Sequence, residues 1–529
     1  MASAEEIYLF RHAVYREAAY HLQVPSARSG LHRAVIAIIE RAWRGRLGEV
    51  CIELARHARA AQDGASAAEL AGLQQLEVQY LVLGLVAPNR MDSAQAIVES
   101  AGRVLALPEF WPAARLTAQA EFAGGLRNYG RLEDVTRAYE DLCRMAAEQG
   151  DLARYSDALI QRALFALHEG DDVAAEQYFD RAQKAAEELG SGSAIGWVMA
   201  ARANLHDFRG DFATAERLMR EAVPLVEHST RGSLALAVRG NLANLLAQQG
   251  RRDEAIAEYL RLREEFAALD SQSGVATAHS NLGRQYLLEG RLEEAEPMIR
   301  QAMQFHVRAG IRTSHAFSAT NLAEVCMLQG RFDEAQSLLD AALDSARETG
   351  IHQRSAAVLV ARAGFELMCG HEQTAQELVE QARAEFEAAR SNVYIPEYCD
   401  IVRLRIAAAM ATTVLAQRGT SRLRAEPPQR RWLPVMRQIM AGIEAALAVN
   451  RRPHGTLIEA AAMAGRALLA ELEAAVAGNR PALVFRGWLA GELRPAQRKA
   501  LLARMHKRSP SQAQALRQSH PALWAAMSA

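Results

Sequence analysis

Asparagine side chains recur at one position of a repeated unit in this sequence. Asn241, Asn281 and Asn321 stand at the same place in three successive units, each at the same short distance before a glycine. An amide side chain offers a hydrogen-bond donor and an acceptor together, so it can pair with a peptide group without requiring a particular sequence. Three such amides in one register predict a surface that binds a peptide or protein segment.

Four further polar residues extend this row. Asn204 and Asn244 lie slightly further along their units, and Arg284 and Glu324 occupy the same register in the next two units. An alternative interpretation is that the asparagines only cap or bridge helices. The complete set of predicted peptide-binding residues, called the asparagine row below, is Asn204, Asn241, Asn244, Asn281, Arg284, Asn321 and Glu324.

Histidine and cysteine form no recognisable catalytic or metal-binding pattern. No histidine pair has the HExxH spacing of a zinc site, and no two cysteines form a CxxC pair. The cysteines are therefore expected to be reduced, buried thiols, and we expect no metal site and no cofactor. The residues concerned are His12, His21, His32, His57, His306 and His315, and Cys51, Cys143, Cys326, Cys369 and Cys399.

Carboxylate pairs and glycine-rich segments do not predict catalysis either. Glu293 and Glu294 follow a glycine turn, where the helix dipole and solvent explain two acids. The sequence contains no Gly-x-Ser-x-Gly elbow and no GxxxxGK[ST] loop, and the GSGSAIG segment at 190–196 lacks the lysine and the preceding strand. We therefore expect no catalytic residue and a protein that is not an enzyme.

Charge is balanced over the whole chain, with 61 basic and 62 acidic residues. A chain with this balance has no overall electrostatic attraction to nucleic acid or to an anionic membrane. The N-terminus lacks a basic region followed by an apolar core, and no apolar run of about 18 residues occurs. The sequence therefore predicts a cytoplasmic protein that does not bind membranes.

The tail from Phe485 departs from this balance. It contains eight basic residues and only Glu492 as an acid, whereas residues 251–350 contain 11 arginines and 16 acidic residues. The tail could fold back onto this acidic stretch, or reach an acidic protein or nucleic acid. The alternative is a solvated helical tail, and nucleic acid is the least favoured partner because the basic charge is confined to the tail.

Glycines at a constant spacing indicate the elements that position the asparagine row. Each glycine precedes a polar segment such as GRLEEA or GRFDEA. Glycine suits the end of a helix that needs a positive φ, and acidic residues favour the start of the next helix. We therefore predict a helix-to-helix turn at each of Gly130, Gly170, Gly210, Gly250, Gly290, Gly330 and Gly370.

Small and large side chains follow each glycine at fixed offsets. In the unit of Gly290 they are Ala295, Ile299 and Ala302. The i, i+4 and i+7 spacing places them on one face of a helix, where small residues allow close approach and the larger one fills the space between helices. This face is predicted to be buried between neighbouring helices.

The segment NLGRQYLLEGRLEEAEPMIRQA, residues 281–302, resembles a tetratricopeptide repeat, with Leu282, Gly283, Tyr286 and Gly290 at the signature offsets. The 40-residue unit is similar to the repeats of kinesin light chain and of bacterial signalling regulators. The resemblance implies an all-α fold, a right-handed superhelical solenoid of antiparallel helix pairs. It also implies that the first helix of each pair lines the concave groove, where asparagine often bonds the main chain of an extended peptide.

Three units depart from the family pattern. Arg162, Arg202 and Arg362 stand where Leu282 matches the signature leucine. We expect the helices that contain these arginines to be slightly rotated, or to expose the face that the leucine would bury.

The two ends of the chain differ from the repeats. Residues 8–40 resemble the helical connector between an ATPase module and its repeat array in large bacterial signalling ATPases and cyclases, and a turn is expected at Asn89 and Arg90. The expected domains are 1–69, a connector-like segment; 70–112, a degenerate helix pair; 113–390, seven repeats; 391–431, a helix and an Arg/Pro-rich linker; and 432–529, a helical region with the basic tail.

Two hypotheses on function follow. The first is a non-enzymatic scaffold or sensor that binds a protein or peptide in the concave groove. The second is the sensory or oligomerising arm of a bacterial signal-transduction ATPase or transcriptional regulator, with a nucleotide-binding partner that supplies the module absent from this chain.

Overall fold

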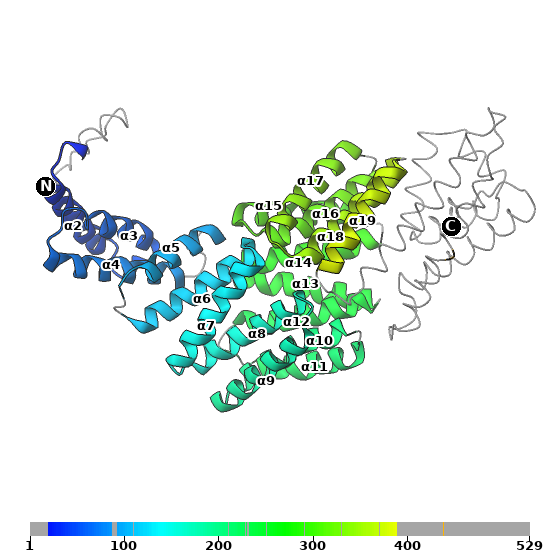
Figure 1. The fold of residues 1–529 in the computed structure, drawn as a ribbon, viewed down its shortest axis with the longest axis horizontal. Helices are drawn as coiled ribbons and strands as arrows, with labels where there is room; N and C mark the ends of the chain where they lie inside the picture. The colour runs from blue at the N-terminus through cyan, green and yellow to red at the C-terminus, as the bar shows by residue number, and fades with distance from the viewer. Residues whose placement is uncertain are drawn as a thin grey trace, which may run out of the picture. The chain divides into compact units, whose positions relative to one another are not determined.

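The computed structural model describes residues 20–388, apart from 87–92, 109–110, 210, 228, 230–231, 250, 290, 330 and 370, together with Arg437. Every regular element in this part of the chain is helical: eighteen α-helices, α2 to α19, and one 3-10 helix, η1. The predicted all-α fold is confirmed (Figure 1). Contacts divide the chain into two compact units, Met1–Arg127 with Arg144–Gly150, and Asn128–Cys143 with Asp151–Ala529.

The first unit has an apolar core to which several helices contribute. Ile36, Leu54, Tyr80 and Val104 are all buried in it. Buried Glu77 is neutralised by Arg103, whose Nε and Nη2 donate to its two oxygens at 2.7 and 3.0 Å. The elements are α2 (Pro25–Ala42), η1 (Leu47–Glu49), α3 (Cys51–Ala60), α4 (Ala67–Val86), α5 (Ala94–Ala106) and most of α6 (Pro112–Tyr129).

The turn expected at 89–90 and the expected regions 391–431 and 432–529 lie outside the described residues, except Arg437.

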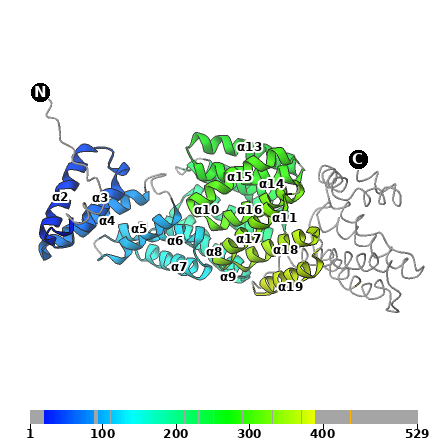
Figure 2. The same ribbon diagram turned by 90° about the horizontal axis from the view of Figure 1, so that it is seen from above.

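The second unit is a stack of helix pairs whose first helices start at a constant interval in the sequence (Figure 2). It begins with most of α7 (Leu132–Glu148). The pairs that follow are α8 (Leu152–His168) with α9 (Asp172–Leu189), α10 (Gly192–Phe208) with α11 (Phe212–Val226), α12 (Gly232–Gln248) with α13 (Arg252–Ala268), α14 (Gln272–Leu288) with α15 (Leu292–Ala309), α16 (Arg312–Gln329) with α17 (Phe332–Glu348), and α18 (His352–Cys369) with α19 (Glu372–Ala388).

The predicted glycines lie at turns between consecutive helices wherever the structure describes those glycines. Gly170, between α8 and α9, has a φ of 74°, and the next residue, Asp171, caps α9 by accepting a hydrogen bond from the Ala174 amide at 2.8 Å. Gly130 lies between α6 and α7. Gly210, Gly250, Gly290, Gly330 and Gly370 fall outside the described residues.

The second helices of the pairs end at a second set of residues, whose backbone is in the left-handed conformation. Gly150, Gly190, Gly310 and Gly350 have φ values between 67° and 69°, and Asp270 has a φ of 53°. These positions have the same spacing as the predicted set but lie midway between its members. Aspartate replaces glycine once because its short polar side chain tolerates the left-handed region better than most.

The predicted small and large residues form the buried face of each pair. Ala295, Ile299 and Ala302 have no exposed surface. Gly283 on α14 lies so close to α15 that a Cβ atom there would approach Ile299 Cγ1 to 2.4 Å. The predicted burial of this face is confirmed, and the close approach explains the glycine of the signature.

The arginines that stand at the position of the signature leucine form ion pairs with acids of the preceding second helix. Arg202 Nη2 lies 2.7 Å from Asp180 Oδ1, Arg162 bonds Glu140 in the same way, and Arg362 bonds Asp340. Each acid stands at the same sequence offset before its arginine. The expected exposure of this face is wrong for Arg162, which is only 6% exposed, because its guanidinium lies over the Tyr178 ring, 5.0 Å from the centroid, and reaches Glu140.

A long-range seam joins the start of the second unit to its last pairs. Leu132 N donates to Thr349 O at 2.9 Å, and Arg312 Nη1 donates to Tyr129 O at 3.0 Å. The Arg312 guanidinium also lies over the Tyr129 ring, 5.6 Å from its centroid. A third contact joins His168 Nδ1 and Gln353 Oε1 at 3.2 Å. These contacts link residues that are far apart in sequence, so the stack returns onto itself.

Candidate peptide-binding surface

The asparagine row lies on four successive first helices, α10, α12, α14 and α16. Neighbouring first helices also touch one another directly, as α12 touches α14 and α14 touches α16. Six of the seven residues are partly exposed, and Asn321 is buried. Polar positions that are separated by a whole repeat in sequence are therefore close in space.

An amide network joins α12 to α14. Asn281 Nδ2 donates to Asn244 Oδ1 at 3.1 Å, and the hydroxyl of buried Tyr259 donates to the same oxygen at 2.6 Å. The sequence pattern pointed to both asparagines but missed Tyr259, because that tyrosine lies on a second helix at a position predicted to be core. The helix-bridging interpretation therefore describes Asn244 and Asn281 in this structure.

An ion pair joins α14 to α16. Arg284 Nη1 lies 2.6 Å from Glu324 Oε2, and the two side chains are 30% and 37% exposed. A partly exposed pair of this kind is worth about 0.2–1 kcal/mol, so a ligand with its own charges can separate it at low cost.

Two other residues of the row have different surroundings. Asn321 is 3% exposed, and its Nδ2 has no hydrogen-bond acceptor within the described region. Asn204 Nδ2 donates to Ala201 O of its own helix at 3.2 Å. The row thus combines amides already used between helices with an unmet donor at Asn321.

The histidines near residue 310 take part in a buried polar network. His306 Nδ1 and the Ser280 hydroxyl each lie 3.1 Å from the Ser318 hydroxyl. Burial lowers the pKa of His306 to about 4, with a smaller effect from His315. His315 Nδ1 is 2.8 Å from the Ser345 hydroxyl. These imidazoles therefore act as neutral hydrogen-bonding groups inside the array.

The N-terminal histidines form a smaller cluster. His32 and His57 approach through their Nδ1 atoms at 2.8 Å, and the Tyr20 hydroxyl lies 2.9 Å from His32 Nε2. Among the described residues, no group of three or more metal-binding side chains converges. His12 lies outside the described residues.

The cysteines that the structure describes are free thiols. Cys51 and Cys326 are buried, and Cys143 is partly buried. Burial raises the pKa of Cys143 and Cys326 to about 11, so both thiols stay protonated and are poor nucleophiles. The side chain of Cys369 and the whole of Cys399 are outside the described part.

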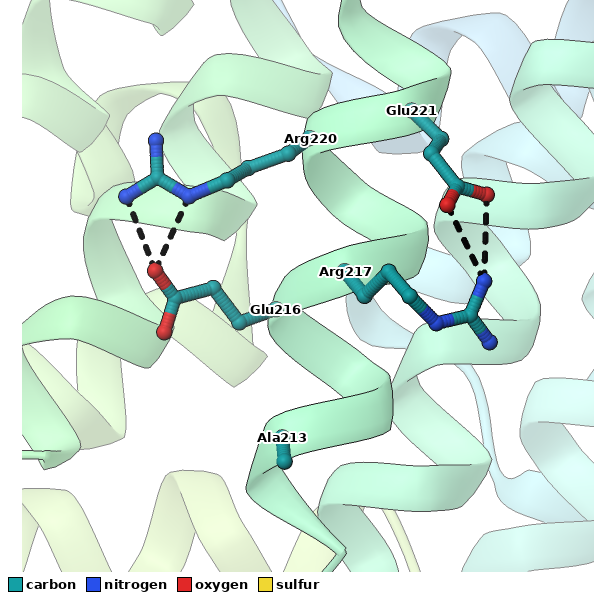
Figure 3. Close-up of a pocket in the computed structure, with 5 residues that line it drawn as sticks. All are labelled: Ala213, Glu216, Arg217, Arg220 and Glu221. Atoms are coloured by element: carbon teal, nitrogen blue, oxygen red, sulfur yellow. Dashed lines mark hydrogen bonds and ion pairs between the residues drawn. The ribbon is translucent and has the colours of Figure 1, made fainter.

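A shallow depression on α11 is lined by charged side chains that form ion pairs with one another. Glu216 accepts from Arg220 at 2.9 Å, and Arg217 donates to Glu221 at 3.0 Å (Figure 3). All the lining residues, including Ala213, belong to one helix. The depression is distinct from the asparagine row and offers no unpaired carboxylate in its lining.

Related ion-pair clusters recur where second helices begin, and we call them the edge clusters. Arg251 bonds Glu216 of the preceding pair at 2.7 Å and Glu254 of its own helix at 2.6 Å. Two units later, Arg331 bonds Glu296 at 2.6 Å and Glu334 at 2.8 Å. Each arginine therefore joins two successive second helices. The edge clusters are defined as Glu216, Arg251, Glu254, Glu296, Arg331 and Glu334.

Family comparison identifies the repeats. Residues 234–306 match one model of the tetratricopeptide repeat, and residues 196–221 and 316–341 match a second model of the same repeat. These three stretches are tetratricopeptide repeats. The resemblance predicted from the signature residues is confirmed, and repeats of this kind imply a protein-interaction scaffold. No curated protein matches the chain.

Three solved structures are similar to the tetratricopeptide array. BtubC (BKLC) from P. vanneervenii is 21% identical, covering 45% of this chain and 93% of that chain, with a TM-score of 0.32. A signal transduction ATPase with numerous domains and a tetratricopeptide repeat sensor, from Pyrococcus horikoshii, is 10% identical over 71% of this chain and 54% of that chain, with a TM-score of 0.36. A tetratricopeptide repeat protein from Parabacteroides merdae is 15% identical over 59% of this chain and 98% of that chain, with a TM-score of 0.33.

The length and composition of the helices also bear on membrane crossing. Among the helices that the structure describes, none combines the length and the apolar character needed to traverse a bilayer.

Proposed function

We propose that the tetratricopeptide array is a non-enzymatic, cytoplasmic scaffold or sensor that binds a peptide or protein segment along the asparagine row. The observation that supports this function is the continuity of the row across successive first helices. Asn281 reaches Asn244 on the helix before it, and Arg284 reaches Glu324 on the helix after it. A segment lying across these helices would therefore meet polar side chains at each step.

The chemistry of the row suits a main chain in extended conformation. A peptide group presents one donor and one acceptor, and an asparagine amide can satisfy both. Asn241 is partly exposed, and Asn321 keeps a donor without an acceptor in the described region. A peptide carbonyl that reached Asn321 would remove the cost of that unmet donor, which is about 1–3 kcal/mol for a buried polar group.

The test is affinity capture from cell extract with a row variant, Asn241→Ala, Asn281→Ala and Asn321→Ala combined. The variant should retain fewer partners than the native array while its helix content is unchanged. A small drop in melting temperature is expected because the bond between Asn281 and Asn244 is lost. Capture at low temperature keeps both proteins folded.

The matched control changes exposed amides on second helices, Gln301→Ala and Gln336→Ala, both away from the row. This control should capture the same partners as the native array. Equal capture by native, control and row variants would reject the row as the binding surface.

A second function is favoured by one observation in the first unit. Helix α2, part of the connector-like segment 8–40, exposes Leu31 and Ile38 by 57% and 65% of their surfaces. An uncovered apolar face of this kind fits docking of a nucleotide-binding signalling partner, for which the array would be the sensory arm. Co-expression with a nucleotide-binding protein encoded beside this one should yield a complex that Leu31→Asp with Ile38→Asp abolishes. Purification of the two proteins as separate species would rule this function out.

A further inference from the structure

Arg354 is a charged side chain for which the described part of the array provides no countercharge. It lies in the first turn of α18 and is partly accessible to solvent. No carboxylate among the described residues pairs with its guanidinium, and burial alone lowers the pKa of Arg354 to about 10. A guanidinium partly withdrawn from water without a partner destabilises the protein that contains it.

The surroundings of Arg354 come from both sides of the long-range seam. Gln353 precedes it on α18, and Gln353 Oε1 lies 3.2 Å from Nδ1 of His168, the last residue of α8. Burial lowers the pKa of His168, and the nearby charge of Arg354 lowers it further. His168 is therefore neutral at pH 7. Gln353 Nε2 has no acceptor among the described residues.

Two acids adjacent in sequence to seam residues are already engaged. Glu348 is paired with Arg312 at 2.6 Å, and Glu169 accepts a hydrogen bond from the Thr136 hydroxyl at 3.2 Å. Neither acid affects the pKa of Arg354. The site therefore offers positive charge and N–H donors, without a matching acceptor in the part of the chain that the structure describes.

The backbone of the seam holds the two sides of this site together. Leu132 N donates to Thr349 O, at the end of the helix before α18, and Arg312 binds both the carbonyl and the ring of Tyr129. These contacts join α16 and the end of α17 to residues 129–132, and the contact of Gln353 with His168 joins α18 to α8. Gln353, the residue before Arg354, therefore lies against His168 although the two are far apart in sequence.

The geometry points to a composite oxyanion site, in which Arg354 binds a carboxylate or a phosphate with Gln353 and His168. A guanidinium presents parallel N–H donors that match either anion. The bound anion would offset the positive field at His168 and favour the imidazolium, which would add a second charge-assisted hydrogen bond. The site shares no residue with the asparagine row, so each proposal can fail without the other.

The test follows the titration of His168 in the full chain, labelled with ¹³C-histidine and kept in a chloride buffer. Three probes are added in turn: inorganic phosphate, an oligoglutamate peptide with an amidated end, and the matching oligoglutamine peptide. His168→Gln assigns the resonance. A bound anion should raise the pKa of His168 by about one unit, Arg354→Gln should abolish the rise, and Arg354→Lys should retain part of it.

The probes also distinguish the source of the anion. A response to oligoglutamate alone supports a site for acidic peptide segments, and a response to phosphate supports a site for free anions. No response of His168 to any probe, or an equal response in Arg354→Gln, would overturn the proposal.

Thermal stability without added anion gives an independent result. Removing an unpaired charge should leave the melting temperature of Arg354→Gln equal to or above that of the native protein. A clear drop would mean that Arg354 already has a structural partner, and the proposal would be wrong. If Arg354→Gln does not fold, the comparison of Arg354→Lys with the native protein in the His168 titration decides the question.

Discussion

Arg251 of the edge clusters and Arg354 beside the long-range seam have opposite electrostatic surroundings. The hydrogen bonds that Arg251 donates to Glu254 and Glu216 raise its pKa, whereas burial lowers the pKa of Arg354, which has no carboxylate partner in the described part of the array. The edge clusters join successive pairs and contain their own acids. The difference teaches that arginines which join helices of this array have acids to pair with, whereas Arg354 has none in the described part, which is why we propose that an anion binds there.

The largest effect is expected when the pH is lowered far enough to protonate His306. The described part of the array would then contain a second cation without a countercharge, in addition to Arg354. His306 is buried, and its folded pKa is about 4, below its ordinary value of 6.5. Between pH 6.5 and pH 4 the unfolded chain therefore binds a proton that the folded chain does not. The free energy of unfolding should fall across this window by up to about 3 kcal/mol, at 1.36 kcal/mol per pH unit.

Urea titrations at pH 7 and pH 4.5 measure this loss. The carboxylates of the ion pairs also titrate near the lower pH, so the control is His306→Gln, which keeps a polar group near Ser318 but does not titrate. The native protein should lose more stability than this variant. Parallel losses in the two proteins would contradict the assignment of His306 as a buried neutral group.

An intermediate effect is expected at the edge clusters. Glu296 accepts from Arg300, Gln329 and Arg331, so Glu296→Gln removes the charge that joins two successive second helices. We expect a loss of about 1 kcal/mol, because these pairs are partly exposed and Arg331 keeps Glu334. Thermal melting at low and high salt measures it, and high salt should shrink the difference. A variant as stable as the native protein at low salt would show that the edge clusters do not stabilise the array.

The helical repeat was predictable because its determinants are local and periodic. Glycine at a turn and the spacing of Ala295, Ile299 and Ala302 on one helix face depend on a few neighbouring residues. The second series of turns was missed because it is not glycine throughout: Asp270 stands at one of its positions, and Thr230 at another. An interrupted series is harder to detect than the unbroken one that starts at Gly130.

The candidate sites depend on geometry that the sequence does not contain. The link from Asn281 to Asn244 requires the distance between two first helices, and Tyr259 joins them from a core position. The seam depends still more on geometry, because small rotations between successive pairs add up before His168 meets Gln353. A contact between residues so distant in sequence was therefore beyond the reach of the repeat pattern.

The smallest effect is expected where the family leucine is restored. Arg362→Leu removes a partly exposed ion pair with Asp340, but leucine can fill the same space between helices. The two changes nearly cancel, so stability should change by no more than about 0.5 kcal/mol.

Asp340→Asn sharpens this prediction, because it removes the acid and leaves Arg362 in place. Arg362 is the more buried of the two side chains, so an arginine without its acid should be less stable than no arginine at all. Asp340→Asn should therefore melt at a lower temperature than Arg362→Leu. The reverse order would show that a partly buried arginine is tolerated without a partner in this array, and it would remove the physical reason for expecting a ligand at Arg354.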